Sequence, residues 1–262
     1  MAPFQVLPST TSHKHEPLVR TLEVFSRLGM CDLDLNLHHI FQEGVAVADV
    51  RAALAAGGQR VHIVSGGWCD FYHATPEIEE TFRSVSGQIA IADALGVPVL
   101  RLFYGRLKRE QYSSAALGTI VGNLKRLSDR YPDRLFVFEN HDGASLRPQI
   151  CHEILSAVDR PNIRMNFDPI NFERAGVDSM EAFRVLEPFI AHVHLKGCRG
   201  RECCEFGAGD VDLTPVVRAL IGGGYTGWFT VEYEGPFDRT VRLYEGFLRA
   251  RSVLAAVSRA RA

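Results

Sequence analysis

Three carboxylates and one imidazole stand at the ends of four successive apolar segments in the second half of the chain. They are Glu139, Asp168, His194 and Glu232. Carboxylate oxygens suit hard cations such as Mg²⁺ and Mn²⁺, and an imidazole nitrogen also suits Zn²⁺ and Co²⁺. If the four segments are neighbouring parallel strands, their carboxyl ends bring these side chains to one place. The pattern predicts one divalent-metal site, with Mn²⁺ as first choice and Mg²⁺, Co²⁺ or Zn²⁺ as alternatives.

Eight short apolar runs follow one another along the chain, and near-continuous apolar runs are typical of strands buried in a parallel sheet. They cover residues 4–9, 31–37, 61–66, 99–105, 135–140, 162–168, 190–197 and 228–234. Segments with apolar residues at helical spacing separate them, and one begins at Pro76 and ends at Gly96, as helix termini favour. The predicted helices cover residues 16–29, 47–58, 76–96, 114–133, 147–159, 179–189, 212–224 and 239–260.

Strand and helix alternate eight times within 262 residues, which is the pattern of an α/β fold with a single (β/α)8 TIM barrel. We therefore expect one domain that covers residues 1–262. A doubly wound open sheet is the alternative. It is disfavoured because no G-x-G-x-x-G motif follows an early strand.

Composition bears on the class of partner. The net charge is −2, from 29 basic and 31 acidic residues, and no long basic run is present, which argues against a nucleic-acid partner. No apolar run reaches membrane-spanning length, and the first residues lack the pattern of a secretory signal, so we expect a cytoplasmic protein without a membrane partner. The cysteines lack zinc or disulfide spacing, and we expect free thiols, including the crowded Cys198, Cys203 and Cys204.

The order of the motifs resembles the sugar phosphate isomerase/epimerase superfamily, the xylose isomerase-like TIM barrels. The resemblance covers most of residues 95–235, and the first third of the chain is less distinctive. It rests on LFVFENHDG (135–143), NIRMNFDPINFERAGVD (162–178), AHVHLKG (191–197) and GAGDVDLTPVVRALIGGGYTGWFTVEYE (207–234). The superfamily contains ketose 3-epimerases, hydroxypyruvate isomerases, inosose and 3-dehydroshikimate dehydratases, and the endonuclease IV branch.

The resemblance implies that Glu139, Asp168, His194 and Glu232 bind one divalent metal ion, and that the two glutamates are also catalytic and transfer protons. A metal polarises a bound ketone and acidifies the adjacent C–H, so that one carboxylate can remove a proton and a second can return one. We predict a metal-dependent isomerase or epimerase of carbohydrate metabolism. Its substrate would be a small sugar or polyhydroxylated carbonyl compound that reacts through an enediolate.

Other functions remain as alternatives. A lyase of the inosose- or 3-dehydroshikimate-dehydratase type shares the enediolate step, and nothing in the sequence separates the two cleanly. An endonuclease IV-like nuclease would need several metals with many more ligands, and this chain lacks a basic surface that could track DNA. A non-catalytic barrel is disfavoured by the complete set of four ligands. Relatives are often dimers or tetramers, so a homo-oligomer is a further expectation.

Further residues on the same strand faces are predicted to bind substrate. His141 and Lys196 each follow a predicted ligand by two residues and so share its direction, although Lys196 is otherwise a lysine at the rim. His192 precedes His194 by two residues and either contacts substrate or is a hydrogen-bonded core histidine. Asn171 stands where several epimerases of the family carry a histidine, which weakens a ketose-3-epimerase assignment.

The remaining candidates come from loops and from the fourth strand. Arg101 points inward near the mouth, and Arg199 and Arg201 follow the seventh strand, where barrels often bind phosphate. The three arginines either bind an anionic substrate or are simply solvated. Trp68 walls the pocket or caps the core. Glu234 is a rival of Glu232 because it shares the inward direction. The first third of the chain adds further pocket candidates: Asn36, His38 and His62.

Overall fold

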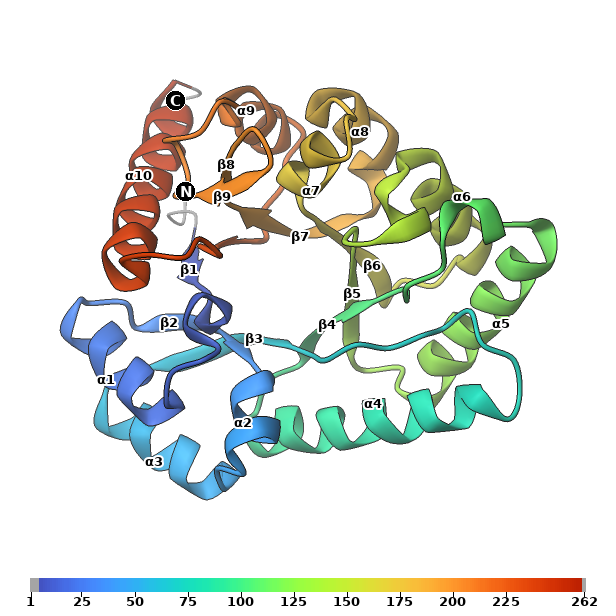
Figure 1. Cartoon of the computed structure of the whole chain (residues 1–262), viewed down its shortest axis with the longest axis horizontal. Helices are drawn as coiled ribbons and strands as arrows, with labels where there is room; N and C mark the ends of the chain where they lie inside the picture. Colours follow the sequence, from blue (N-terminus) through green and yellow to red (C-terminus); the bar gives the residue numbers. More distant parts are fainter. Residues whose placement is uncertain (1–4, 261–262) are drawn as a thin grey trace.

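The computed structural model describes residues 5–260, and it forms a ring of parallel strands with helices around the outside (Figure 1). The strands of the ring are β1 Val6–Pro8, β2 Asp32–Asn36, β3 Arg60–Ser65, β4 Val99–Phe103, β5 Leu135–Glu139, β6 Ile163–Phe167, β7 Ile190–Leu195 and β10 Trp228–Val231. They lie in the order β1-β10-β7-β6-β5-β4-β3-β2, and an isolated parallel bridge from Ser9 to Asp34 joins the two edges. The fold is a single (β/α)8 TIM barrel, as predicted.

All eight predicted strands are present, each within a few residues of its expected position. Phe4, at the start of the first predicted strand, lies outside the described residues. Two further short strands, β8 Gly197–Arg199 and β9 Glu202–Cys204, form an antiparallel hairpin directly after β7 that the sequence did not predict. The six cysteines are free thiols, and Cys198 and Cys203 lie opposite each other in this hairpin.

The helices cover the outer face of the barrel (Figure 1). They are α1 Leu18–Arg27, α2 His38–Glu43, α3 Val47–Ala56, α4 Glu77–Ala94, α5 Ser114–Arg130, α6 Pro148–Val158, α7 Pro169–Arg174, α8 Ser179–Leu186, α9 Thr214–Gly222 and α10 Arg239–Arg259. The eight predicted helices are present, whereas α2 and α7 were not expected. These two have six residues each, too few for the periodicity of apolar positions to stand out. No helix of residues 5–260 is long and apolar enough to cross a membrane.

The apolar core lies between the strands and the helices. Phe136 and Phe138 of β5 are fully buried, and Phe138 packs against Tyr104 and Phe71 with ring centroids 5.0 and 5.5 Å apart. Since side chains alternate along a strand, the residue that follows, Glu139, points to the inside of the barrel. The outer face of each strand therefore supplies the packing energy, and the inner face is left for polar groups.

The inside of the barrel carries buried polar side chains where bulky aliphatic residues usually dominate. Those with almost no exposed surface include Asp34, Arg101, Asn166, His192 and Thr230. Burying a polar or charged group without a partner is costly, so such an interior must be held by hydrogen bonds and compensating charges. The polar interior indicates a functional site rather than a structural core.

Replacing Phe138 with alanine tests the packing of the outer layer. We expect a loss of about 3–5 kcal/mol in the free energy of unfolding, because a fully buried aromatic ring would leave a cavity. Urea unfolding followed by circular dichroism measures it. Phe237→Ala is the control, because Phe237 is 74% exposed and its removal should change stability by at most about 0.5 kcal/mol. Equal losses in the two variants would contradict this description of the core.

Candidate metal centre

The four predicted metal ligands converge at the carboxyl ends of their strands. Glu139 ends β5, Asp168 directly follows β6, His194 lies in β7 and Glu232 directly follows β10. All four are buried. One ligand atom from each of Glu139, Asp168 and His194 lies within 4.8 Å of the others, and Glu232 Oε2 lies 3.4 Å from His194 Nδ1. The strand order β10-β7-β6-β5 makes these elements neighbours, which explains why residues far apart in sequence meet.

This donor set fits a divalent cation. His194 Nδ1 is buried without a hydrogen-bond partner, and it faces Glu232 Oε2 at 3.4 Å and Glu139 Oε1 at 3.7 Å. An imidazole nitrogen between two carboxylates, with Asp168 beside them, supplies the mixed oxygen and nitrogen ligands that Mn²⁺, Mg²⁺, Co²⁺ and Zn²⁺ accept in proteins. The residues present could therefore hold one such ion.

The predicted ligands are held by two asparagines: Asn140, which directly follows β5, and Asn171 in α7. The Asn171 side chain donates to Glu139 Oε1 at 3.1 Å, and the Asn171 backbone N–H donates to Asp168 Oδ1 at 3.1 Å. The Asn140 amide exchanges two hydrogen bonds with the Asp168 backbone, at 2.8 and 2.9 Å. Asn171, expected at the substrate, is instead turned toward the ligands. Sequence reasoning missed Asn140, whose partners belong to the next strand and leave no trace in local spacing.

Lys196 is buried among carboxylates and does not lie at the rim. Its Nζ lies 2.8 Å from Asp168 Oδ2, 3.2 Å from Glu234 Oε2 and 3.7 Å from Glu232 Oε2. Burial alone would lower the pKa of Lys196, but Asp168 and Glu234 outweigh it and raise the pKa well above its usual value. The ammonium is therefore a fixed positive charge next to the centre.

A second fixed charge comes from Arg101 of β4. Its Nε lies 3.4 Å from Glu139 Oε2, and its Nη1 donates to the Gly66 carbonyl at 3.3 Å. Burial would raise the pKa of Glu139, but His194 and Arg101 lower it to about 2. Burial likewise opposes the ionisation of Glu232, but His194 leads the charges that lower its pKa well below its usual value. Both glutamates are therefore ionised at neutral pH.

The pKa of His194 shifts upward, in the opposite direction from the pKa values of the two glutamates. Burial would lower its pKa, but the Glu232 and Glu139 carboxylates raise it well above the usual value of a histidine. In the metal-free protein the imidazole therefore carries a proton on both nitrogens at neutral pH. A metal ion at Nδ1 would have to displace one of these protons.

A cavity of about 470 Å³ opens over the centre, and Glu139, Lys196 and Glu232 line it. One wall is aromatic. Trp68 stacks on Phe103 with ring centroids 4.3 Å apart. The His141 ring makes T-shaped contacts with both, and its centroid lies 5.2 Å from that of Trp68 and 5.0 Å from that of Phe103. The volume suits a small molecule, because ligand pockets span about 300–1,000 Å³.

The first third of the chain supplies the opposite side of this cavity. Lys14 and His15, which come after β1, line it together with Asn36 at the end of β2 and His38 just beyond it. In the strand order β1 and β2 stand across the barrel from β5 and β6. Asn36 and His38 were predicted there, whereas Lys14 and His15 were missed because no regular element or motif marks their segment.

Several predicted substrate contacts are not among the cavity's lining residues. His192 is buried below His194, and Arg199 and Arg201 are exposed in the hairpin after β7. His62 was placed at the pocket wrongly. It lies in the first half of β3, where its Nε2 is 2.6 Å from Asp32 Oδ1 and its ring is 4.1 Å from that of Trp228, at the amino-terminal ends of the strands.

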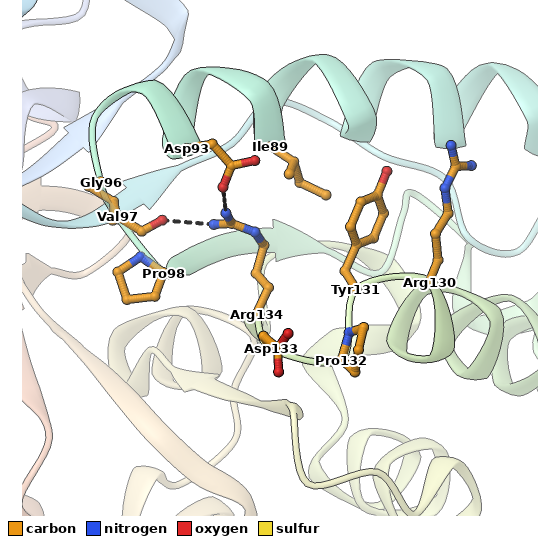
Figure 2. Close-up of a pocket in the computed structure, with 10 residues that line it drawn as sticks. All are labelled: Ile89, Asp93, Gly96, Val97, Pro98, Arg130, Tyr131, Pro132, Asp133 and Arg134. Carbon is orange, nitrogen blue, oxygen red and sulfur yellow. Dashed lines mark hydrogen bonds and ion pairs between the residues drawn. The ribbon is translucent and has the colours of Figure 1, made fainter.

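A second cavity, of about 430 Å³, lies at that opposite end of the barrel, between the ends of α4 and α5 and the starts of β4 and β5 (Figure 2). Arg134 crosses it, donates to the Val97 carbonyl at 2.8 Å and pairs with Asp93. In TIM barrels this end contributes to stability, and the chemistry takes place at the carboxyl ends of the strands. We assign Arg134 a structural role.

Comparison with known proteins finds a curated relative and solved structures of the same fold. A curated 3-dehydroshikimate dehydratase of Bacillus anthracis is 39% identical over 124 residues, which is 46% of this chain and 44% of that protein, so the match spans less than half of the relative. A D-tagatose 3-epimerase-like protein superposes with a TM-score of 0.81 at 17% identity, covering 99% of this chain and 100% of that one. The IOLI protein, whose structure holds a zinc atom, superposes with a TM-score of 0.80 at 16% identity and coverages of 97% and 98%.

At such low identities the two solved structures establish the shared fold alone. The profile of one family, described as the xylose isomerase-like TIM barrel, matches residues 25–250, which is most of the chain. This chain therefore belongs to the xylose isomerase-like TIM barrel family.

Proposed function

We propose that this protein is a divalent-metal-dependent enzyme that removes a proton next to the carbonyl of a small polyhydroxylated substrate. The observation that carries the proposal is the pair of ionised glutamates, Glu139 from β5 and Glu232 from β10, on either side of His194 Nδ1. Asp168 completes the set of four ligands. The two carboxylates come from strands separated by β6 and β7, so they approach a bound substrate from different directions.

A metal ion held by the four ligands would act as a Lewis acid on the substrate carbonyl and lower the cost of forming an enediolate. One glutamate removes the proton from the carbon beside the carbonyl, the C–H electron pair forms a carbon–carbon double bond, and the π electrons of the carbonyl move onto its oxygen. His194, Arg101 and Lys196 lower the pKa values of the two glutamates, so that both are ionised and can accept a proton. The aromatic wall around Trp68 excludes water from one side of the cavity.

An isomerase or epimerase follows if the second glutamate returns a proton to the neighbouring carbon or to the other face of the same carbon. Mn²⁺ is our first choice of ion because three of the four ligands are carboxylates. The cavity volume of about 470 Å³ agrees with a small-molecule substrate.

A dehydratase is the second candidate, and the similarity to a 3-dehydroshikimate dehydratase favours it. The first step is the same proton removal. The enediolate then expels a hydroxyl group from the carbon beyond, which leaves as water after taking up a proton, and a carbon–carbon double bond forms. The absence of a histidine at Asn171, where several epimerases carry one, also agrees with this candidate.

The first experiment joins two measurements on the purified protein. Elemental analysis should find about one divalent ion per chain, and incubation in D₂O with ketoses, inososes or 3-dehydroshikimate should place deuterium beside a carbonyl. A new conjugated chromophore and the loss of one water would identify the dehydratase, whereas a product of unchanged mass would identify the isomerase or epimerase. A protein that binds no metal after reconstitution would contradict both.

The Glu139→Gln variant tests the proton-transfer role. The amide keeps the shape of the side chain but cannot accept a proton. We therefore expect turnover of the substrate that the deuterium experiment identifies to fall by a factor of about 10²–10⁴. Glu181→Gln is the matched control, because Glu181 is exposed on α8 and should leave turnover unchanged. Wild-type turnover in Glu139→Gln, with an unchanged circular dichroism spectrum, would sink the assignment.

Metal binding should release a proton. Since Glu232 and Glu139 keep His194 protonated in the metal-free protein, an ion that binds Nδ1 must displace about one proton at neutral pH. Calorimetric titrations with Mn²⁺ in buffers of different ionisation enthalpy measure this number. His152→Gln, a change of an exposed histidine on α6, should release the same number as wild type. Binding without proton release would mean that His194 is not a ligand.

A further inference from the structure

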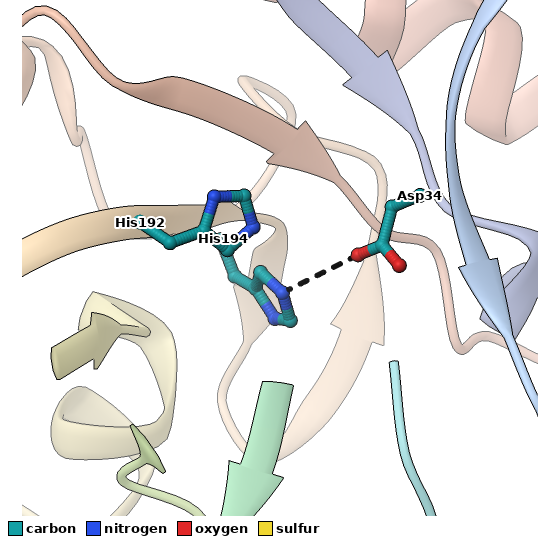
Figure 3. Close-up of side chains that lie close together, drawn as sticks. All are labelled: Asp34, His192 and His194. Carbon is teal, nitrogen blue, oxygen red and sulfur yellow. Dashed lines mark ion pairs between the residues drawn. The ribbon is translucent and has the colours of Figure 1, made fainter. Parts of the chain in front are cut away.

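We propose that Asp34, assisted by Asn166, is a positioning residue that fixes the tautomer of His194 so that Nδ1 faces the metal. The inference rests on the proposed metal centre, and its test can fail separately from that centre. Asp34 lies on β2, on the far side of His194 from Glu139 and Glu232, and Figure 3 shows its carboxylate aimed at the His194 ring. No motif of the sequence singled out Asp34.

The two nitrogens of His194 face different groups. Nδ1 looks toward the Glu139 and Glu232 carboxylates, as described above. Nε2 lies 3.7 Å from Asp34 Oδ2 and 3.1 Å from Asn166 Nδ2. A neutral imidazole has one N–H and one lone pair, so the group that engages Nε2 decides whether Nδ1 has a lone pair for a metal.

When Asp34 is ionised, its carboxylate can accept hydrogen bonds but cannot donate them. It is fully buried, its Oδ1 accepts from Ser65 Oγ at 2.7 Å, and its Oδ2 has no hydrogen-bond partner. An unpartnered carboxylate oxygen in the barrel interior favours a proton on the nearest nitrogen, which is His194 Nε2. That proton leaves the lone pair on Nδ1, at the side of the ligands. The Ser65 bond sets the direction of the carboxylate.

Asn166 can support either tautomer, which is why it assists and does not decide. Its Nδ2 faces His194 Nε2, while its own Oδ1 is buried without a partner. A half-turn of the amide exchanges the two atoms, and Oδ1 then accepts from a protonated Nε2. This turn gives a partner to Oδ1 and adds a second acceptor for the same N–H. Asp34 selects the tautomer, and Asn166 can follow it.

Local irregularities in the sheet lie beside both residues. The register of β2 against β3 shifts between Leu33 and Asp34, and the register of β6 against β7 shifts between Met165 and Asn166. Such bulges occur next to active sites, where they re-aim a side chain. Each partner of Nε2 therefore follows a point at which the regular pairing of the barrel is broken.

A second metal site would be the competing interpretation, because atoms of Asp34, His192 and His194 lie within 4.8 Å of one another. An imidazole whose Nδ1 binds the metal keeps its proton on Nε2 and cannot offer Nε2 to another ion. Asp34 and His192 alone provide fewer ligands than protein sites for Zn²⁺ usually have. His192 instead packs its ring at 90° to that of His194, with centroids 5.2 Å apart.

The Asp34→Asn variant is the test, with the metal affinity as the readout. Hydrogen-bond partners of a metal-binding histidine typically contribute a factor of about 10–100 in metal affinity, so the dissociation constant for Zn²⁺ should rise by about that factor in Asp34→Asn. Asp32→Asn is the matched control, because Asp32 lies two residues away on the same strand and pairs with Arg60 and His62 at the other end of the barrel. Asp32→Asn should bind one Zn²⁺ ion per chain, with a dissociation constant within about twofold of that of wild type.

A rescue variant separates positioning from general damage to the fold. Asn166→Asp in the Asp34→Asn background restores a carboxylate beside Nε2, and we expect most of the lost affinity to return. Nitrogen-15 NMR of the Zn²⁺-bound wild type should show the proton of His194 on Nε2. An Asp34→Asn protein with wild-type affinity, or a His194 with its proton on Nδ1, would overturn the inference.

The remaining outcomes are also decisive. Two ions per wild-type chain, of which Asp34→Asn and His192→Gln each lose one, would make Asp34 a ligand and overturn the positioning role. A wild-type chain that binds no Zn²⁺ or Mn²⁺ would overturn the proposed function, and this inference with it. One ion bound with equal affinity by wild type and Asp34→Asn would overturn the inference alone.

Discussion

The balance of buried charge is the constraint on which the rest of the structure depends. Four carboxylates, those of Asp34, Glu139, Asp168 and Glu232, are buried inside the barrel, and only Arg101 and Lys196 are permanent cations among them. Uncompensated charges are very costly to bury, so the carboxylates draw a proton onto His194. Replacing that proton with a divalent ion would bring the total charge of these buried side chains and the ion to zero. The same imbalance that raises the pKa of His194 agrees with the proposed binding of a divalent metal.

This constraint divides the barrel into layers with different tasks. The outer faces of the strands carry the aromatic and aliphatic side chains that pack against the helices, so the inner faces are free to be polar. Two asparagines, Asn140 after β5 and Asn171 in α7, hold Asp168 and Glu139 by directional hydrogen bonds. Packing thus supplies the stability, and hydrogen bonds place the ligands.

The strands, the helices and the convergence of Glu139, Asp168, His194 and Glu232 could be predicted from the sequence because each leaves a local trace: apolar runs, helical spacing and polar residues at strand ends. Partnerships across strands leave none. Lys196 was expected at a rim or at substrate because spacing shows its direction but not the carboxylates around it. The error over His62 was avoidable, since it lies near the start of its strand and the chemistry of a barrel lies near the strand ends. Asp34 was missed because β2 carries no recognisable motif.

The register shift between β6 and β7 shows how one residue connects the sequence to the centre. Met165 pairs with Ile190, but the next residue, Asn166, pairs with His192, so β7 holds one residue more than β6 at this point. With regular pairing Asn166 would stand opposite Ala191, and the direction of every later side chain of β7 relative to β6 would be reversed. The extra residue puts the histidines of β7 and Asn166 on the same inner face. The contact between His194 and Asn166 thus depends on a single irregularity, which no periodic pattern could reveal.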